Sequence, residues 1–234
     1  MSCDHDPTNS RLLVDKAADL GVTLDEVAAQ EVLAFLDAML KANQQVNLTA
    51  VRDREAAVVL HALDSLSFQL ADLRPQRVLD LGTGNGFPGV GVAALSPRAA
   101  VTLMDRTGKK VRAIQACLSQ AGIDRVAAIQ MDASQAPSLN AEFRLGFDLC
   151  TARAVARPEV VARMAAPLVR PGGHIAIWLE ADAVIDERIG DFRLHETIAY
   201  QLPDPAARAR TLAVWSKDET REPRPRAGAE TRLA

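Results

Sequence analysis

The sequence predicts an α/β fold in which a doubly wound, mostly parallel, Rossmann-like sheet follows an N-terminal helical extension. From residue 76 onward, short apolar runs of strand length alternate with segments of helical periodicity, which is the pattern of βαβ units. One apolar run leads directly into Gly82, Gly84 and Gly86, which predicts a tight turn from a strand into a helix. We therefore expect three regions: a helical extension over residues 1–75, a ligand-binding fold over 76–217 and a disordered tail over 218–234.

The extension contains the periodic apolar patterns of three helices. Two helices are expected within residues 10–42, and Thr23 with Glu26 three positions later matches a capping box before the second. Residues 47–50 predict a turn, and residues 54–71 predict a further helix with an apolar stripe. We expect these helices to pack beside the sheet.

The second region contains the elements of the sheet. Strands are expected at 77–81, 100–105, 126–131, 147–151 and 174–179, with helices at 88–95, 107–121 and 158–169. A Pro-Gly-Gly turn at residues 171–173 would precede the fifth strand. Residues 192–201 and 210–216 predict an antiparallel hairpin at the sheet edge, and the polar residues after 217 predict disorder.

The spacing of the glycines separates two classes of cofactor. The dinucleotide fingerprint requires a third glycine, but Phe87 occupies that position. Asp80 instead precedes the first glycine by two residues, in the D-x-G-x-G-x-G form that S-adenosylmethionine enzymes use. We predict that cofactor, and the alternative is a glycine-rich turn without a ligand. The predicted binding residues of this turn are Asp80, Gly82, Gly84, Gly86 and Phe87.

Acidic residues follow the next two strands. Asp105 ends the second strand, where an acid in a nucleotide-binding fold accepts hydrogen bonds from ribose hydroxyls, although aspartate there is also a common helix cap. Asp132, with Ala133 and Ser134, follows the third strand and would meet the adenine ring. A plain turn aspartate is the alternative for Asp132.

Arg153 follows the fourth strand and is expected in the cleft, as a cofactor contact and as the catalytic residue. The planar guanidinium can hold a carboxylate, a phosphate or a guanine edge, and a surface ion pair is the alternative. Lys109 and Lys110 follow Asp105 on one helix. They would either line the cleft with positive charge or lie on a solvated face.

Several methylation chemistries lack their motifs in this chain. The N/D-P-P-Y/F motif of exocyclic amine methylation is replaced by Thr-Ala-Arg-Ala at residues 151–154, and Cys150 lies within a predicted strand rather than at a reactive position. No Cys/His spacing predicts a metal site. These exclusions favour an acceptor that is already nucleophilic, such as guanine N7, which needs positioning rather than a base.

The composition favours a cytoplasmic protein. The 234 residues are 48% apolar, but no apolar run is long enough to cross a membrane, and no secretory signal is recognisable at the N-terminus. The three scattered cysteines are typical of reduced thiols. The net charge of −3 does not indicate a nucleic-acid binder. However, residues 76–134 are net basic, so that half of the chain could present a basic face.

Four motifs together resemble one protein family. They are NLTAVRD at 47–53, HALDSL at 61–66, LDLGTGNGFPG at 79–89 and TARAVA at 151–156. In order and spacing they resemble the bacterial 16S ribosomal RNA guanine-N7 methyltransferase G family, also called glucose-inhibited division protein B. The resemblance implies a class I S-adenosylmethionine-dependent methyltransferase that acts on N7 of a guanine in the 530 loop of 16S RNA. It further implies a cytoplasmic location and a partner that is 16S RNA, the small ribosomal subunit or its assembly intermediate, and we expect a monomer.

The resemblance also implies roles for individual residues. Gly82 and Phe87 would flank the methionine end of the cofactor, Ala133 and Ser134 would contact adenosine, and Arg153 would be the cleft arginine. The predicted RNA contacts are Asn47, Arg52, His61 and the two lysines of the helix after Asp105, Lys109 and Lys110.

Some positions leave alternatives open. His61 and Asp64 would lie near the glycine turn as supports, as RNA contacts or as satisfied structural residues. The family usually has an acid at Ser134, Lys-Gly at residues 179–180 and histidine at Thr211, so these departures concern RNA affinity or the exact substrate. A methyltransferase of the same fold acting on a small molecule or protein, and a cofactor-binding protein without catalysis, are the alternative functions.

Overall fold

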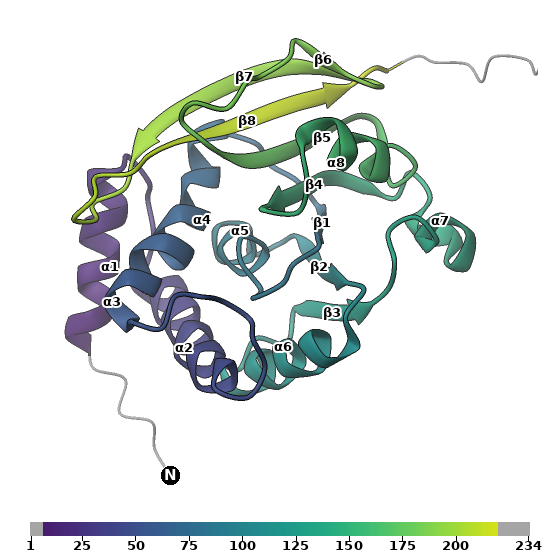
Figure 1. Ribbon diagram of the computed structural model, residues 1–234. Coiled ribbons are helices and arrows are strands. Elements are labelled where there is room, and N and C mark those ends of the chain that lie inside the picture. Colours follow the sequence, from purple (N-terminus) through teal and green to yellow (C-terminus); the bar gives the residue numbers. More distant parts are fainter. Residues whose placement is uncertain (1–6, 220–234) are drawn as a thin grey trace, which may run out of the picture.

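The computed structural model describes residues 7–219 and shows one mixed sheet with helices on both faces (Figure 1). The eight strands of the described residues have the order β3-β2-β1-β4-β5-β8-β7-β6. Strands β1 to β5 pair in parallel, whereas β8 pairs antiparallel with both β5 and β7. The predicted fold class and the predicted hairpin are confirmed. The strands are β1 Arg77–Leu81, β2 Ala100–Asp105, β3 Val126–Gln130, β4 Phe147–Arg153, β5 Val169–Glu180, β6 Arg188–Ile189, β7 Phe192–Gln201 and β8 Ala209–Lys217.

The helices divide between the two faces of the sheet. The helices of the extension lie on the same face as α5 and α6, while α8 packs on the opposite face against β5 (Figure 1). The α-helices are α1 Pro7–Asp19, α2 Glu26–Asn43, α3 Arg54–Ala57, α4 Asp64–Leu66, α5 Gly89–Leu95, α6 Gly108–Gln120, α7 Ala136–Leu139 and α8 Pro158–Ala165. A π-helical turn spans Val58–Leu63, and 3-10 turns span Ser67–Ala71 and Ala141–Phe143.

Two apolar cores fill the space between the sheet and its helices. Successive side chains of a strand point to opposite faces, so Val78 belongs to one core and Leu79 to the other. The first core joins Phe35 of α2 to Leu103 of β2, and the second includes Val161 of α8. The extension therefore shares its core with the sheet, which positions the extension beside the carboxyl ends of the strands.

The segments of the extension differ in detail from the prediction. Asp25 caps α2, because its carboxylate accepts the Ala28 N–H at 2.7 Å. Thr23 is not the cap, since its N–H donates instead to the Gln69 side chain at 2.5 Å. The predicted helix 54–71 is divided into α3, the π-helical turn, α4 and a 3-10 turn.

The fourth and fifth strands are longer than predicted. Strand β4 ends at Arg153, so this arginine is the last strand residue rather than a residue of the following loop. Helix α8 ends at Ala165, and the predicted turn at 171–173 lies within β5. There the register with β4 shifts and Gly172 has a φ of 71°. The two short elements α7 and β6 were not predicted, because so few residues show no periodicity.

Both chain ends extend beyond the described part. Most of the tail predicted to be disordered, residues 220–234, lies outside the described residues, as do residues 1–6. Within residues 7–219 no helix has the length and apolar character to cross a lipid bilayer.

Candidate active site

A cavity of about 580 Å³ opens at the carboxyl ends of the central strands. The glycine turn after β1, the loop that carries Leu48 and Val51, and the ends of β5 and β8 form its wall. The topology thus brings together residues from all four sequence motifs. The predicted site residues on this wall are His61, Gly82, Gly84, Phe87, Asp105, Lys110 and Arg153.

Only one of the three alternating glycines leaves open space above it. A Cβ on Gly82 would lie 2.9 Å from Val155, and a Cβ on Gly86 would lie 2.4 Å from Phe35. A Cβ on Gly84 would meet no described atom closer than 3.7 Å. Gly84 therefore forms a cradle that a side chain would fill, as expected where a backbone approaches a ligand.

Gly86 is explained by packing, which gives a stability prediction. Gly86→Ala is expected to lower the free energy of unfolding by about 2–4 kcal/mol, because the new Cβ overlaps the buried Phe35 ring and φ is 93°. Urea unfolding measures this loss. Adding Phe35→Leu to Gly86→Ala should restore part of the lost free energy of unfolding. If the losses of the two single variants simply added in the double variant, the proposed overlap would be contradicted.

Asp80 and Thr83 supply buried polar atoms beside the cradle. The Thr151 hydroxyl donates to Asp80 Oδ1 at 2.7 Å, whereas Asp80 Oδ2 and Thr83 Oγ1 have no hydrogen-bond partner in the described part of the chain. Burial raises the pKa of Asp80 to about 6, although the hydrogen bond from the Thr151 hydroxyl opposes this shift. Thr83 lines the cavity. Because an unpaired buried polar atom is costly, Thr83 on the wall fits a ligand with a polar end, such as the amino-acid end of S-adenosylmethionine, whereas Asp80 lies fully buried behind the wall.

The buried charge of Asp80 gives a pH-dependent stability. Its pKa is about 6 when folded and 3.8 for the free side chain, so ionisation opposes folding above pH 6, and the cost disappears as the pH falls towards 4. Asp80→Asn is therefore expected to be more stable than the wild type by about 2–3 kcal/mol at pH 8 and equal to it near pH 4. Urea unfolding across this range measures the difference. A difference that does not change with pH would contradict the assignment.

Asp105 joins the glycine turn to the start of α6. Its Oδ2 accepts the Gly84 N–H at 3.1 Å, and its Oδ1 accepts the Thr107 N–H at 2.8 Å. Thr107, rather than Asp105, is the N-cap residue of α6. Each carboxylate oxygen keeps a further lone pair, so Asp105 can shape the turn and also accept a hydrogen bond from a ligand hydroxyl.

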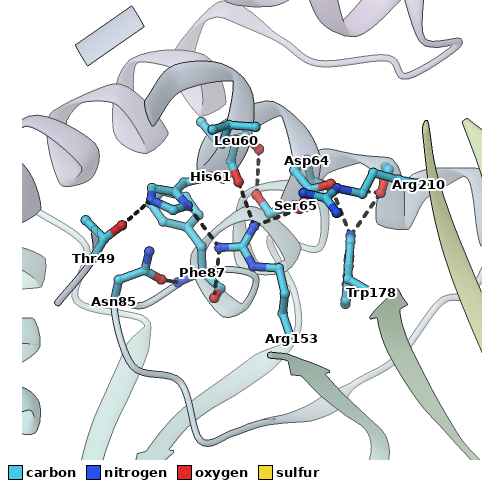
Figure 2. Close-up of polar contacts among 12 residues, drawn as sticks. Thr49, Leu60, His61, Asp64, Ser65, Asn85, Phe87, Arg153, Trp178 and Arg210 are labelled. Atoms are coloured by element: carbon cyan, nitrogen blue, oxygen red, sulfur yellow. Dashed lines mark hydrogen bonds and ion pairs between the residues drawn. The ribbon is translucent and has the colours of Figure 1, made fainter. Parts of the chain in front are cut away.

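Arg153 is held by acceptors from three segments of the chain (Figure 2). Its Nη1 donates to Asp64 Oδ2 at 2.8 Å and to the Leu60 carbonyl oxygen at 3.0 Å. Its Nη2 donates to the Phe87 carbonyl oxygen at 3.4 Å and lies 3.3 Å from His61 Nδ1. The side chains of Arg153 and Asp64 are 14% and 4% exposed. This is a buried ion pair, so the alternative of a surface ion pair does not hold.

His61 links Arg153 to the loop of the first motif. Its Nε2 lies 2.9 Å from Thr49 Oγ1, and its ring stacks on Phe87 with centroids 6.2 Å apart. Burial, followed by the Arg153 charge, lowers the pKa of His61 to about 4. Because Arg153 donates to Nδ1, the neutral imidazole carries its proton on Nε2 and donates it to Thr49.

Three residues of this network were not identified from the sequence. Asn43 holds the loop of the first motif, since its Oδ1 accepts the Leu48 and Thr49 N–H groups at 2.8 and 3.0 Å. An asparagine beside a turn was an available signal. The Tyr200 hydroxyl donates to Asp64 Oδ1 at 2.6 Å, and Trp178 Nε1 donates to the Asp64 carbonyl oxygen at 2.9 Å. No local pattern marks these two aromatic residues.

The structure does not bring every predicted site residue onto the cavity wall. Asp132 and Ser134 are exposed beyond it, and Asp132 Oδ1 accepts both the N–H and the hydroxyl of Ser134, at 2.9 and 2.6 Å. These two hydrogen bonds lower the pKa of Asp132. Ala133 is buried. The residues off the wall are Asp80, Gly86, Asn47, Arg52, Lys109, Asp132, Ala133 and Ser134.

One of the departures from the resembled family, Glu180, lies on the wall of the cavity. Glu180 of β5 forms an ion pair with Arg210 of β8, its partner in the sheet register. Both residues line the cavity, whereas Thr211 is buried. Within residues 7–219 no cluster of three or more His, Cys, Asp or Glu side chains has a metal-binding arrangement.

The strand order, the antiparallel β8 beside β5 and the glycine turn after β1 define a class I S-adenosylmethionine-dependent methyltransferase fold. A family model described as rRNA small subunit methyltransferase G matches residues 28–188. The chain belongs to this family, and the predicted family, enzyme class and cofactor are confirmed.

Curated relatives and solved structures agree with this assignment. The chain is 34% identical to ribosomal RNA small subunit methyltransferase G of Symbiobacterium thermophilum, covering 92% of this chain and 93% of that protein. It is also 34% identical to the protein of the same name from Chromohalobacter salexigens, covering 81% and 89%. Among solved structures, a mutant of MtNAS in complex with S-adenosylmethionine is 15% identical with a TM-score of 0.52, covering 91% and 92%. The last likeness shows the fold alone.

Proposed function

We propose that this protein transfers the methyl group of S-adenosylmethionine to N7 of a guanine in the 530 loop of 16S ribosomal RNA. The observation that supports this most directly is the shared cavity, where the Gly84 cradle, Asp105 and the fixed Arg153 lie on one wall. The family and the names of its members give small-subunit ribosomal RNA as the acceptor.

The cavity suits an acceptor atom that is nucleophilic without deprotonation. Bound S-adenosylmethionine supplies a methyl group on a sulfonium, and transfer to N7 leaves a neutral thioether and moves the positive charge onto the guanine. His61 is already held between Thr49 and Arg153. Cys150 is buried, and burial raises the pKa of its thiol. Because neither group is free to act as a base or nucleophile, the protein contributes orientation and electrostatics.

The proposed RNA contacts lie around this cavity. Asn47 and Arg52 are exposed on the loop whose Leu48 and Val51 line the wall, and Lys109 is exposed beside Lys110 at the start of α6. Cations at such positions would bind phosphates and make RNA affinity depend on salt. We propose a cytoplasmic monomer whose partner is 16S RNA, the small subunit or its assembly intermediate.

The test is transfer of a tritiated methyl group from S-adenosylmethionine to isolated small subunits and to naked 16S RNA. We expect label in the RNA at one guanine, and cleavage of the chain at 7-methylguanine locates it. Label in protein or in a small-molecule extract would instead support the alternative acceptors. Cofactor binding without any transfer, beside an active control enzyme, would support a non-catalytic role.

A further inference from the structure

The Asp64 carboxylate lies on the cavity wall and is fully engaged by side chains from two distant strands. Its Oδ2 accepts from Arg153 of β4 at 2.8 Å, and its Oδ1 accepts from the Tyr200 hydroxyl of β7 at 2.6 Å. Its side chain is 4% exposed, yet it borders the cavity. This carboxylate therefore sits at a fixed position close to any ligand in the cavity.

The charges on the described cavity wall are balanced. Its anionic and cationic residues are Asp64, Asp105, Glu180, Lys110, Arg153 and Arg210. Glu180 pairs with Arg210, and Asp64 pairs with Arg153. His61 adds no charge at neutral pH, because its pKa is lowered to about 4. Without Asp64, the wall would gain an unmatched positive charge at Arg153.

Tyr200 holds the carboxylate from the outer hairpin. Burial, followed by the Asp64 charge, raises the pKa of the Tyr200 phenol, so it remains a neutral donor. In the sheet register Tyr200 pairs with Arg210, which in turn pairs with Glu180. The hairpin thus contributes both a neutral donor to one ion pair and the cation of the other.

We propose that Asp64, held by Tyr200, offsets the charge of Arg153 so that the cavity does not disfavour the cationic sulfonium of S-adenosylmethionine relative to the neutral thioether of S-adenosylhomocysteine. This inference rests on the proposed function for its cofactor and deepens it. The two ligands differ by one methyl group and one positive charge, so the ratio of their affinities reports the charge of the wall. A wall balanced by Asp64 has no net positive charge to repel the sulfonium, and it tolerates the positive charge that transfer moves onto the guanine.

Calorimetric titration of both ligands at pH 8 tests the proposal. Asp64→Asn is expected to lower the ratio of S-adenosylmethionine to S-adenosylhomocysteine affinity about tenfold, because one unmatched cation remains at short range in a partly desolvated cavity. Arg153→Gln is expected to shift the ratio in the opposite direction. The double variant Asp64→Asn/Arg153→Gln is expected to return it towards the wild-type value, since neutral groups replace both charges of the buried pair.

Two further variants separate charge from packing. Tyr200→Phe keeps the ring and removes the donor, so a shift of about twofold in the direction of Asp64→Asn is expected. Lys217→Met is the matched control, because Lys217 lies on the same hairpin away from the cavity and donates to the Ala166 and Val169 carbonyl oxygens. It should leave the ratio unchanged.

The outcomes are distinct. If Asp64→Asn lowered the affinity for both ligands equally, the inference would be overturned and Asp64 would be a purely structural residue. The same holds if Arg153→Gln shifted the affinity ratio in the same direction as Asp64→Asn. If Asp64→Asn does not fold, the sign of the Arg153→Gln shift decides alone. A wild-type protein that binds neither ligand would contradict the cofactor, whereas wild-type binding with an unchanged ratio in every variant contradicts only the role of Asp64.

Discussion

Arg153→Ala is expected to abolish measurable methyl transfer and to lower the free energy of unfolding by about 3–5 kcal/mol. The stability loss follows because Asp64 would remain as a buried carboxylate without its cation. The loss of transfer follows because the guanidinium joins the π-helical turn, through the Leu60 carbonyl oxygen, to the glycine turn, through the Phe87 carbonyl oxygen. A displaced cavity wall would no longer orient the methyl donor and the acceptor, and this orientation is the main contribution expected of the site. Tritiated methyl transfer and urea unfolding measure the two effects.

The chain offers a matched control for this variant. Arg157 is an exposed arginine four residues later, between β4 and α8, and Arg157→Ala should change stability by less than about 0.5 kcal/mol. Arg153→Lys keeps the charge but lacks the planar fork that reaches two acceptors at once, so it should recover stability more than activity. Wild-type transfer rates in Arg153→Ala would refute the proposed role.

The sheet could be predicted because its signals are local. The first three strands lie within one residue of their expected bounds, since each is a short, largely apolar segment that a polar or glycine-containing turn follows. The error at 171–173 has a physical reason. Pro-Gly-Gly is typical of a turn, but here β4 pairs with β5 on both sides of it, Phe147 with Val169 and Leu149 with His174, with a register shift between.

The network around Arg153 could not be predicted, because its contacts are distant in sequence. Asp64 is 89 residues from Arg153, and Tyr200 is 136 residues from Asp64. The sequence placed Arg153 in the cleft, but only the fold shows that its guanidinium is occupied by protein acceptors. The π-helical turn is equally hidden, since its apolar pattern is that of an α-helix, and it presents the Leu60 carbonyl oxygen to the arginine.

Gly84→Val is expected to weaken S-adenosylmethionine binding by at least about 100-fold. A Cβ at this position meets only the Gly82 carbonyl oxygen, at 3.7 Å, so the branched side chain would project into the open cavity instead of into protein. The φ of 55° adds a backbone cost to the variant. The Gly84 N–H also donates to Asp105, so strain here would move the carboxylate proposed to accept from the ribose. Calorimetric titration measures the affinity directly.

Gly122→Val is the control for Gly84→Val, because it has the same cost of a left-handed backbone conformation but leaves the cavity unchanged. Gly122 follows α6 with a φ of 69°, and a Cβ there would meet no described atom within 4 Å. Both variants therefore place a branched residue in a left-handed conformation in open space, and both should lose a similar stability of about 1–3 kcal/mol. Only Gly84→Val alters the cavity, so only it should lose cofactor affinity. If the two variants bound S-adenosylmethionine equally, the glycine turn would not be the cofactor site, and the assignment of Asp105 would be wrong with it.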